Sequence, residues 1–149
     1  MTNNKKLFNQ ITIIGLGLIG SSLALSIRKS KISSRTVGYS RSPKTRNTSK
    51  RLKLVDKVGN KLEDSVRGSD LIIICTPLSS YANIIKKIIP HISKATIISD
   101  VGSAKEKTIN EIIPLLSNDD IFIPAHPIAG TEKVVQVLGL QNYLMTGGV

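Results

Sequence analysis

The chain has 149 residues, 40% of them hydrophobic, and carries a formal net charge of +11 at pH 7. This length suits one ordinary domain and excludes a second domain of comparable size. The single cysteine excludes an intrachain disulfide, so we expect a reducing compartment, the cytoplasm.

Strands and helices alternate from the amino terminus onward. A β-branched run over 10–15 predicts a strand, and apolar residues at helical spacing predict a helix over 18–30. The run 35–40 predicts a second strand, and 43–55 predicts a helix that starts with a proline. The later elements are predicted strands over 70–77, 95–100 and 120–126, and predicted helices over 79–92 and 103–116. This alternation predicts an α/β fold with a mainly parallel sheet and right-handed crossovers.

The hexapeptide GLGLIG joins the first predicted strand to the first predicted helix. In a GxGxxG motif, Gly15 allows the sharp turn, Gly17 lets a pyrophosphate approach the backbone, and Gly20 lets helix and strand pack closely. Leu18 and Ile19 would then open the helix whose N-terminus faces the phosphates. In this setting the motif predicts a Rossmann-type, doubly wound nucleotide-binding domain, with a merely structural glycine turn as the alternative.

The segment after the second predicted strand indicates which dinucleotide is bound. An NAD site expects an acidic residue about 20 residues beyond the glycines, but residues 1–55 contain no Asp or Glu and 12 Lys and Arg. Ser40, Arg41 and Ser42 stand there instead, and a guanidinium grips a 2′-phosphate well. We therefore predict NADP as the cofactor, with NAD possible; the alternative is that Arg41 is a solvated loop residue.

Further polar segments follow three later predicted strands, at the sheet edge where open parallel sheets bind ligands. These segments are Thr76–Pro77, 100–105 and 125–132. His126 therefore belongs beside a bound nicotinamide, whereas we interpret His91, within IIPHIS, as structural. The sequence suggests no metal site.

Parts of the sequence are also consistent with two other functional classes. Lys6 and the apolar run after it resemble a secretory signal, but the glycines and serines that interrupt the run fit a nucleotide loop better. The basic first third is consistent with nucleic-acid binding, but the chain has only three Tyr and two Phe for base stacking. We therefore expect neither a membrane nor a nucleic-acid partner.

Four motifs together resemble the nucleotide-binding half of the prephenate/arogenate (cyclohexadienyl) dehydrogenases of tyrosine biosynthesis. They are the glycine loop, the CTP of Cys75–Pro77, the SDVGSAK of Ser99–Lys105 and the HPIAGTE of His126–Glu132. The resemblance covers residues 9–133 in order and spacing, and the last two motifs are its most specific part. A 3-hydroxyacid dehydrogenase would share the fold but gives no reason for HPIAGTE.

The resemblance implies an NAD(P)-dependent oxidative decarboxylation of prephenate or arogenate. This resemblance implies that His126 forms a hydrogen bond with the ring 4-hydroxyl of the substrate and takes up its proton as hydride leaves C4. It also implies that Ser103 orients His126. Gly130 and Thr131 would lie near the substrate. Asp100 and Lys105 are less clear, since a helix cap and a solvated lysine account for them equally well.

The resemblance also implies a C-terminal helical domain, which forms the dimer and holds the substrate carboxylates in that family. We expect residues 1–133 to be the NAD(P)-binding domain and the helical domain to be absent, so that the homodimer is lost and the chain is a truncated, inactive fragment. The alternatives are a non-catalytic NAD(P)-binding remnant and a basic nucleic-acid-binding domain. The sequence does not choose between prephenate and arogenate.

The tail over residues 134–149 has no charge and no clear period. In the family, AGTE is commonly followed by a segment like KSGPGAGFAKLF. One coding sequence for such a continuation, with a single A deleted, encodes KVVQVLGLQNYLMTGGV, which matches Lys133–Val149. We therefore expect 134–149 to be a frameshifted, non-native tail; the alternative is a real apolar strand and loop.

Overall fold

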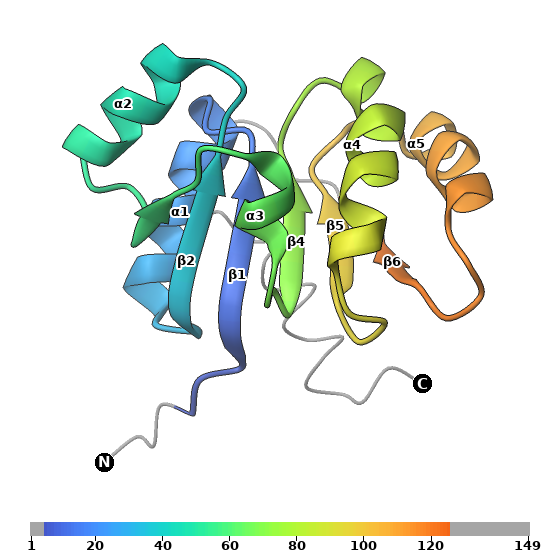
Figure 1. The fold of residues 1–149 in the computed structure, drawn as a ribbon, viewed down its shortest axis with the longest axis horizontal. Coiled ribbons are helices and arrows are strands. Elements are labelled where there is room, and N and C mark those ends of the chain that lie inside the picture. The colour runs from blue at the N-terminus through green and yellow to red at the C-terminus, as the bar shows by residue number, and fades with distance from the viewer. Residues whose placement is uncertain (1–4, 126–149) are drawn as a thin grey trace.

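The computed structural model describes residues 5–125, which form a six-stranded, fully parallel sheet in the order β3-β2-β1-β4-β5-β6 (Figure 1). The strands are β1 (Phe8–Ile14), β2 (Ser33–Tyr39), β3 (Lys57–Val58), β4 (Leu71–Ile74), β5 (Ile97–Asp100) and β6 (Ile121–Ile123). The helices are α1 (Leu18–Ser30), α2 (Pro43–Arg51), α3 (Leu62–Val66), α4 (Tyr81–Ile88) and α5 (Lys105–Ile112). Three 3-10 turns are η1 (Leu78–Ser80), η2 (Ile89–His91) and η3 (Ile113–Leu115).

The central strand β4 is buried on both faces, as its unbroken apolar run requires. Its Leu71 and Ile73 belong to the hydrophobic cluster that contains Leu23 and Ile27 of α1. Its Ile72 and Ile74 belong to a second cluster, on the face covered by α4. Successive side chains of a strand point to opposite faces, so one short strand contributes to both layers of the core.

The two faces of the sheet are covered by different helices. Figure 1 shows α1 behind the sheet, with α3 and α4 in front of it and α5 beside α4. The face that α4 presents to the sheet consists of Tyr81, Ile84, Ile85 and Ile88, all buried. Helices on both faces of a parallel sheet confirm the predicted doubly wound α/β fold.

Prolines and a left-handed residue shorten the predicted helices. The helix predicted over 43–55 ends at Arg51, and Lys53 beyond it has a φ of 52°. The helices predicted over 79–92 and 103–116 end in 3-10 turns that contain Pro90 and Pro114, because proline lacks the N–H that continues an α-helix. The sequence did not predict β3 or α3, which have only two and five residues.

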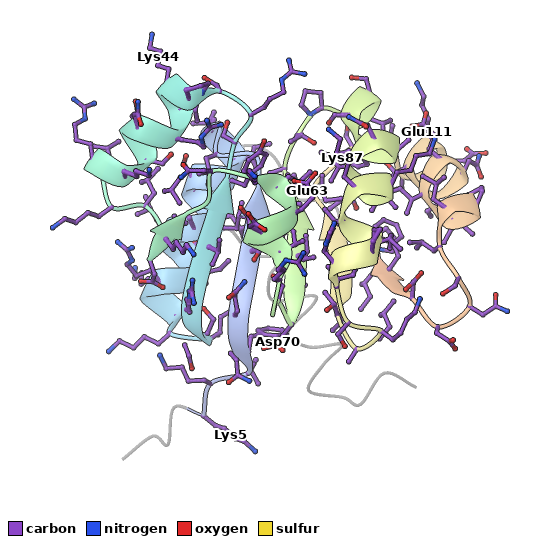
Figure 2. The ribbon with its side chains drawn as sticks, viewed as in Figure 1. Lys5, Lys44, Glu63, Asp70, Lys87 and Glu111 are labelled. Atoms are coloured by element: carbon purple, nitrogen blue, oxygen red, sulfur yellow. The ribbon has the colours of Figure 1, made fainter. Side chains whose placement is uncertain are left out.

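Asp70 lies at the edge of the sheet where the strands begin, and it is labelled near the bottom of Figure 2. Its Oδ2 accepts hydrogen bonds from the backbone N–H groups of Asn9 at 2.6 Å and Gln10 at 3.2 Å. The carboxylate therefore fixes the start of β1 beside the start of β4. This carboxylate lies far from the edge on which the predicted site residues converge.

Some predicted features lie outside the described residues: His126, Gly130, Thr131 and the tail over 134–149. Within residues 5–125 no helix combines the length and the apolar character needed to cross a membrane.

Candidate functional site at the carboxyl edge of the sheet

The glycine loop joins β1 to α1, and each of its three glycines has its own geometric reason. Gly15 has a φ of 99°, and a Cβ there would lie 2.9 Å from the Cys75 carbonyl. A Cβ on Gly20 would lie 1.9 Å from the carbonyl oxygen of Gly15. A Cβ on Gly17 would meet nothing within 4 Å. Two glycines therefore allow close packing, and the third leaves open space in front of the loop.

Helix α1 begins at that open space without a capping side chain. Gly17 is its N-cap, no side chain bonds its first N–H groups, and no acidic residue lies in its first turn. The side chains of Leu18 and Ile19 are exposed there. Unpaired N–H groups and the positive end of a helix dipole suit the phosphates of a dinucleotide.

In the loop after β2, Arg41 is exposed to solvent, and Arg46 binds the backbone of the loop. Arg46 Nη1 donates hydrogen bonds to the carbonyl oxygens of Ser40 at 2.7 Å and Arg41 at 3.0 Å. Ser42 caps α2 by accepting a hydrogen bond from the Thr45 N–H at 3.3 Å. Ser40 is half-buried, whereas Arg41 and Ser42 are exposed. The Arg46 guanidinium therefore binds the loop backbone, whereas Arg41 is exposed to solvent.

Backbone contacts bring the loops after β2 and β4 to the glycine loop. The Gly15 N–H donates to the Tyr39 carbonyl at 2.8 Å, and the Cys75 N–H donates to the Ile14 carbonyl at 2.7 Å. Thr76 is half-buried and Pro77 is exposed. Burial, and secondarily the nearby Asp100 carboxylate, raise the pKa of the Cys75 thiol from 9.0 to about 12. This thiol is therefore neutral at pH 7.

A buried ion pair lies at the end of β5. Asp100 is fully buried, and both of its carboxylate oxygens lie 2.7 Å from Lys105 Nζ. Asp100 Oδ2 also accepts hydrogen bonds from the Gly102 N–H at 2.9 Å and the Tyr81 hydroxyl at 3.3 Å. Burial and this carboxylate raise the pKa of the Tyr81 phenol far above its ordinary value of 10.0.

This arrangement corrects the two sequence-based accounts of these residues. Asp100 is not a helix cap, because the N-cap of α5 is Ala104 and no side chain bonds there. Lys105 is not a solvated lysine, because its side chain is only 25% exposed and its amine contacts Asp100. Sequence reasoning missed Tyr81 altogether. An aspartate directly after a buried apolar strand was the available signal, but the sequence does not show which side chains surround it.

The structure brings most of the described candidate residues to one edge. The glycine loop contacts Cys75 and Thr76, and the Val101 N–H donates to the Ile74 carbonyl at 3.2 Å. Ser103 is exposed at this edge, in the loop between β5 and α5. His91 lies away from it, with Nδ1 2.9 Å from Arg67 Nη2. Among residues 5–125, no three His, Cys, Asp or Glu side chains are close enough to share a metal ion.

Comparisons with known families and sequences give one consistent set of matches. Residues 23–144 match the model of the family described as prephenate dehydrogenase, nucleotide-binding domain. A cyclohexadienyl dehydrogenase of Zymomonas mobilis is 39% identical over 127 residues, which are 85% of this chain and 43% of that protein. A prephenate dehydrogenase of Bacillus subtilis is 30% identical over 124 residues, which are 83% of this chain and 33% of that protein.

Solved structures give the same match. A prephenate dehydrogenase of Aquifex aeolicus, crystallised with hydroxyphenyl propionate and NAD+, superposes with a TM-score of 0.73 at 29% identity. The match covers 84% of this chain and 43% of that one. A Synechocystis arogenate dehydrogenase gives a TM-score of 0.69 at 28% identity and covers 94% of this chain and 57% of that one. The chain thus spans less than half the length of the two curated relatives above.

Proposed function

This chain belongs to the prephenate dehydrogenase family through its nucleotide-binding domain, and we propose that it binds NADP(H) at the carboxyl edge of its sheet. The observation that carries the proposal is the glycine loop. Gly15 and Gly20 have no room for a side chain, whereas the space in front of Gly17 is open. The part of the loop that a pyrophosphate must approach is thus the part that the protein leaves empty.

The residues present fit a dinucleotide. The first backbone N–H groups of α1, at Leu18 and Ile19, would hold the pyrophosphate, since no side chain competes for them. Thr76 and Pro77 would line the site from the end of β4, because their loop touches Gly15. When bound, the oxidised nicotinamide accepts a hydride from the substrate.

The preference for NADP rests on the loop after β2. Arg41 is exposed, Ser40 and Ser42 flank it, and no acidic residue follows β2 before Asp56. The Asp56 carboxylate accepts the Thr36 N–H at 2.7 Å, so it is already engaged elsewhere along β2. An exposed guanidinium without a neighbouring carboxylate suits a 2′-phosphate. NAD is the second candidate, because the Aquifex aeolicus relative was crystallised with NAD+.

The chemistry we propose is the oxidative decarboxylation of prephenate or arogenate in tyrosine biosynthesis. His126 accepts the proton of the substrate's ring 4-hydroxyl while hydride departs from C4, and Ser103 orients the imidazole. A neutral imidazole suits this role near pH 7. The ring carboxylate leaves as CO2, and its bonding electrons complete the aromatic ring. Gly130 and Thr131 lie beside the substrate in this proposal.

We also propose limits on what the 149-residue chain does alone. Orienting the reactants accounts for up to about 7–11 kcal/mol of barrier reduction in well-oriented systems. A chain that spans 43% of the Zymomonas mobilis relative would not supply all of that orientation. We therefore expect these 149 residues by themselves to bind the dinucleotide with little or no turnover. Separately, we propose a cytoplasmic location.

Titration of the purified 149-residue chain tests the proposal. NADPH, NADH and single-stranded DNA are added separately at moderate salt, and binding is followed by nucleotide fluorescence or DNA anisotropy. We expect NADPH to bind more tightly than NADH, with no DNA binding. Salt-sensitive DNA binding without nucleotide binding would instead favour a basic nucleic-acid-binding domain. Robust formation of NADPH from prephenate or arogenate would contradict the expected lack of turnover.

For the tail, we propose that residues 134–149 are a frameshifted reading of the family's continuation. The support is the match of Lys133–Val149 to a one-base deletion in such a coding sequence. The match with the family model extends to residue 144 and therefore overlaps this segment. The nucleotide sequence of the gene is the direct test of a frameshift. Sequencing the locus should show a short run of A at the junction and, downstream in another frame, a helical dehydrogenase domain. Absence of either would remove the proposal.

A further inference from the structure

One carboxylate connects four separate segments at the site edge. Asp100 Oδ2 accepts the Gly102 N–H at 2.9 Å, and Asp100 Oδ1 accepts the Ala125 N–H at 3.2 Å. Tyr81 at the start of α4 and Lys105 at the start of α5 contact the same group. No part of the Asp100 side chain reaches solvent, so its hydrogen-bonding capacity is directed to the protein.

The two backbone groups that Asp100 holds lie next to the two proposed catalytic residues. Gly102 immediately precedes Ser103, and Ala125 immediately precedes His126. The two amides belong to different loops, 23 residues apart in sequence (102 to 125). The shared carboxylate therefore fixes the points from which the chain continues into Ser103 and His126.

The chemistry of the group explains why an aspartate stands here. An ionised carboxylate only accepts hydrogen bonds, with two oxygens and about four lone-pair sites. All of its partners at this site are donors: two amides, one hydroxyl and one ammonium group. Asparagine has the same shape but replaces one oxygen with an NH2 group, which would face the N–H donors. The site therefore requires the charge as well as the shape of Asp100.

Gly102 has little room for a side chain, because the Asp100 carboxylate and the Tyr81 hydroxyl lie beside it. A Cβ on Gly102 would lie 2.9 Å from Asp100 Oδ2 and 3.1 Å from the Tyr81 hydroxyl oxygen. A side chain at this position would therefore push the loop away from the carboxylate. Glycine lets the backbone N–H approach closely enough to donate its bond.

We propose that Asp100 is a positioning residue that fixes the Gly102 and Ala125 amides relative to each other, and so holds the backbone directly before the proposed catalytic residues Ser103 and His126. The inference rests on the proposed function only for the roles of those two residues. The link through Asp100 is a property of the described fold. A solely structural brace would stabilise the protein without affecting the His126 imidazole in particular.

Asp70 provides a matched control. Like Asp100, it accepts two backbone N–H groups next to a strand, but it does so at the amino edge of the sheet. The test compares Asp100→Asn with Asp70→Asn in the 149-residue chain, with amide exchange and histidine signals read by NMR. The chain has only two histidines, so His91 serves as the internal reference for His126.

We expect Asp100→Asn to speed amide exchange at Gly102 and Ala125 about tenfold beyond any global change, and to shift the imidazole signals of His126 but not of His91. Asp70→Asn should speed exchange at Asn9 and Gln10 and leave both histidines unchanged. Folded Asp100→Asn protein with wild-type exchange at Gly102 and Ala125 and an unmoved His126 would overturn the proposal.

A second variant covers the case in which Asp100→Asn does not fold. Tyr81→Phe removes only the longest of the hydrogen bonds to Asp100, and we expect about threefold faster exchange at Gly102 with a smaller shift of His126. Unchanged values in this variant would then overturn the proposal. None of these measurements needs a ligand, so they are independent of the NADPH titration that tests the proposed function.

Discussion

The loop between β1 and α1 and the loop between β5 and α5 lie at the same edge of the sheet, but they are held in place by different physical means. The first is held by the absence of side chains, because backbone atoms occupy the space that a Cβ on Gly15 or Gly20 would need. The second is held by a buried charge, because Asp100 collects donors from four segments. We therefore expect an added side chain to destabilise the first loop, and the removal of a charged or hydrogen-bonding group to destabilise the second.

This difference separates packing from electrostatics within one site. A packed backbone tolerates almost no added volume, since a new methyl group must displace main-chain atoms. A buried ion pair tolerates small changes of volume but not the loss of a partner, which leaves an uncompensated charge away from water. Substitutions in the two loops should consequently differ in kind.

The largest effect is expected from Gly20→Ala. Its new Cβ would lie 1.9 Å from the Gly15 carbonyl oxygen, and both groups are parts of the main chain. The helix must move away from the strand, at a cost of about 3 kcal/mol of unfolding free energy. Urea unfolding of the variant and the wild type measures this loss.

Gly17→Ala is the matched control for that prediction. The same methyl group there meets nothing within 4 Å, so stability should change by less than about 1 kcal/mol. The methyl group would nevertheless stand where we propose that the pyrophosphate binds, so NADPH affinity should fall at least about tenfold. Equal losses of stability in the two variants would contradict the separate reasons assigned to these glycines.

The next effect is expected from Lys105→Met, which keeps the aliphatic stem but removes the amine. The Asp100 carboxylate would remain fully buried without its cation. Loss of one partner of a buried pair typically costs about 3–5 kcal/mol; because the lysine side chain is 25% exposed, we expect about 2 kcal/mol. Asp64→Asn is the control, because the Arg67–Asp64 pair is 59% and 66% exposed and should contribute less than about 0.5 kcal/mol. Similar losses in both variants would show that burial of Asp100 is not decisive.

The same contrast explains what the sequence could predict. The glycine loop is visible in the sequence, because strand, GxGxxG and helix follow one another along the chain. The contact of Gly15 with the Cys75 carbonyl is not visible there, because it joins distant segments. The order of alternating elements predicted the sheet, because each long element shows its own period. The sequence shows Asp100 and Lys105 but not their ion pair, because the distance between the two side chains depends on the orientation of α5 relative to the sheet. Tyr81 carries no local signal, since its partner lies 19 residues away.

A smaller effect, on cofactor choice, is expected from Arg41→Asp. The exposed guanidinium would be replaced by a carboxylate that repels a 2′-phosphate and suits a 2′-hydroxyl. We expect NADPH to bind about tenfold more weakly, equivalent to about 1.4 kcal/mol, and NADH to change less than about threefold. Arg35→Asp makes the same change of charge at an exposed position earlier in β2 and should leave the ratio of the two affinities unaltered. Equal weakening of both nucleotides by Arg41→Asp would exclude a role in reading the 2′-phosphate.

The smallest effect is expected at Cys75, which lies between the two loops. Burial, and then the Asp100 carboxylate, raise the pKa of its thiol from 9.0 to about 12. Above pH 9 the unfolded chain releases this proton while the folded chain keeps it, so stability should fall by about 1 kcal/mol as pH rises from 9 to 10. Cys75→Ala removes the titrating group, and its small cavity lowers stability by an amount independent of pH. Urea unfolding at pH 8, 9 and 10 should therefore give curves of stability against pH that converge as pH rises. Parallel curves would mean that the thiol is not held neutral between the glycine loop and Asp100.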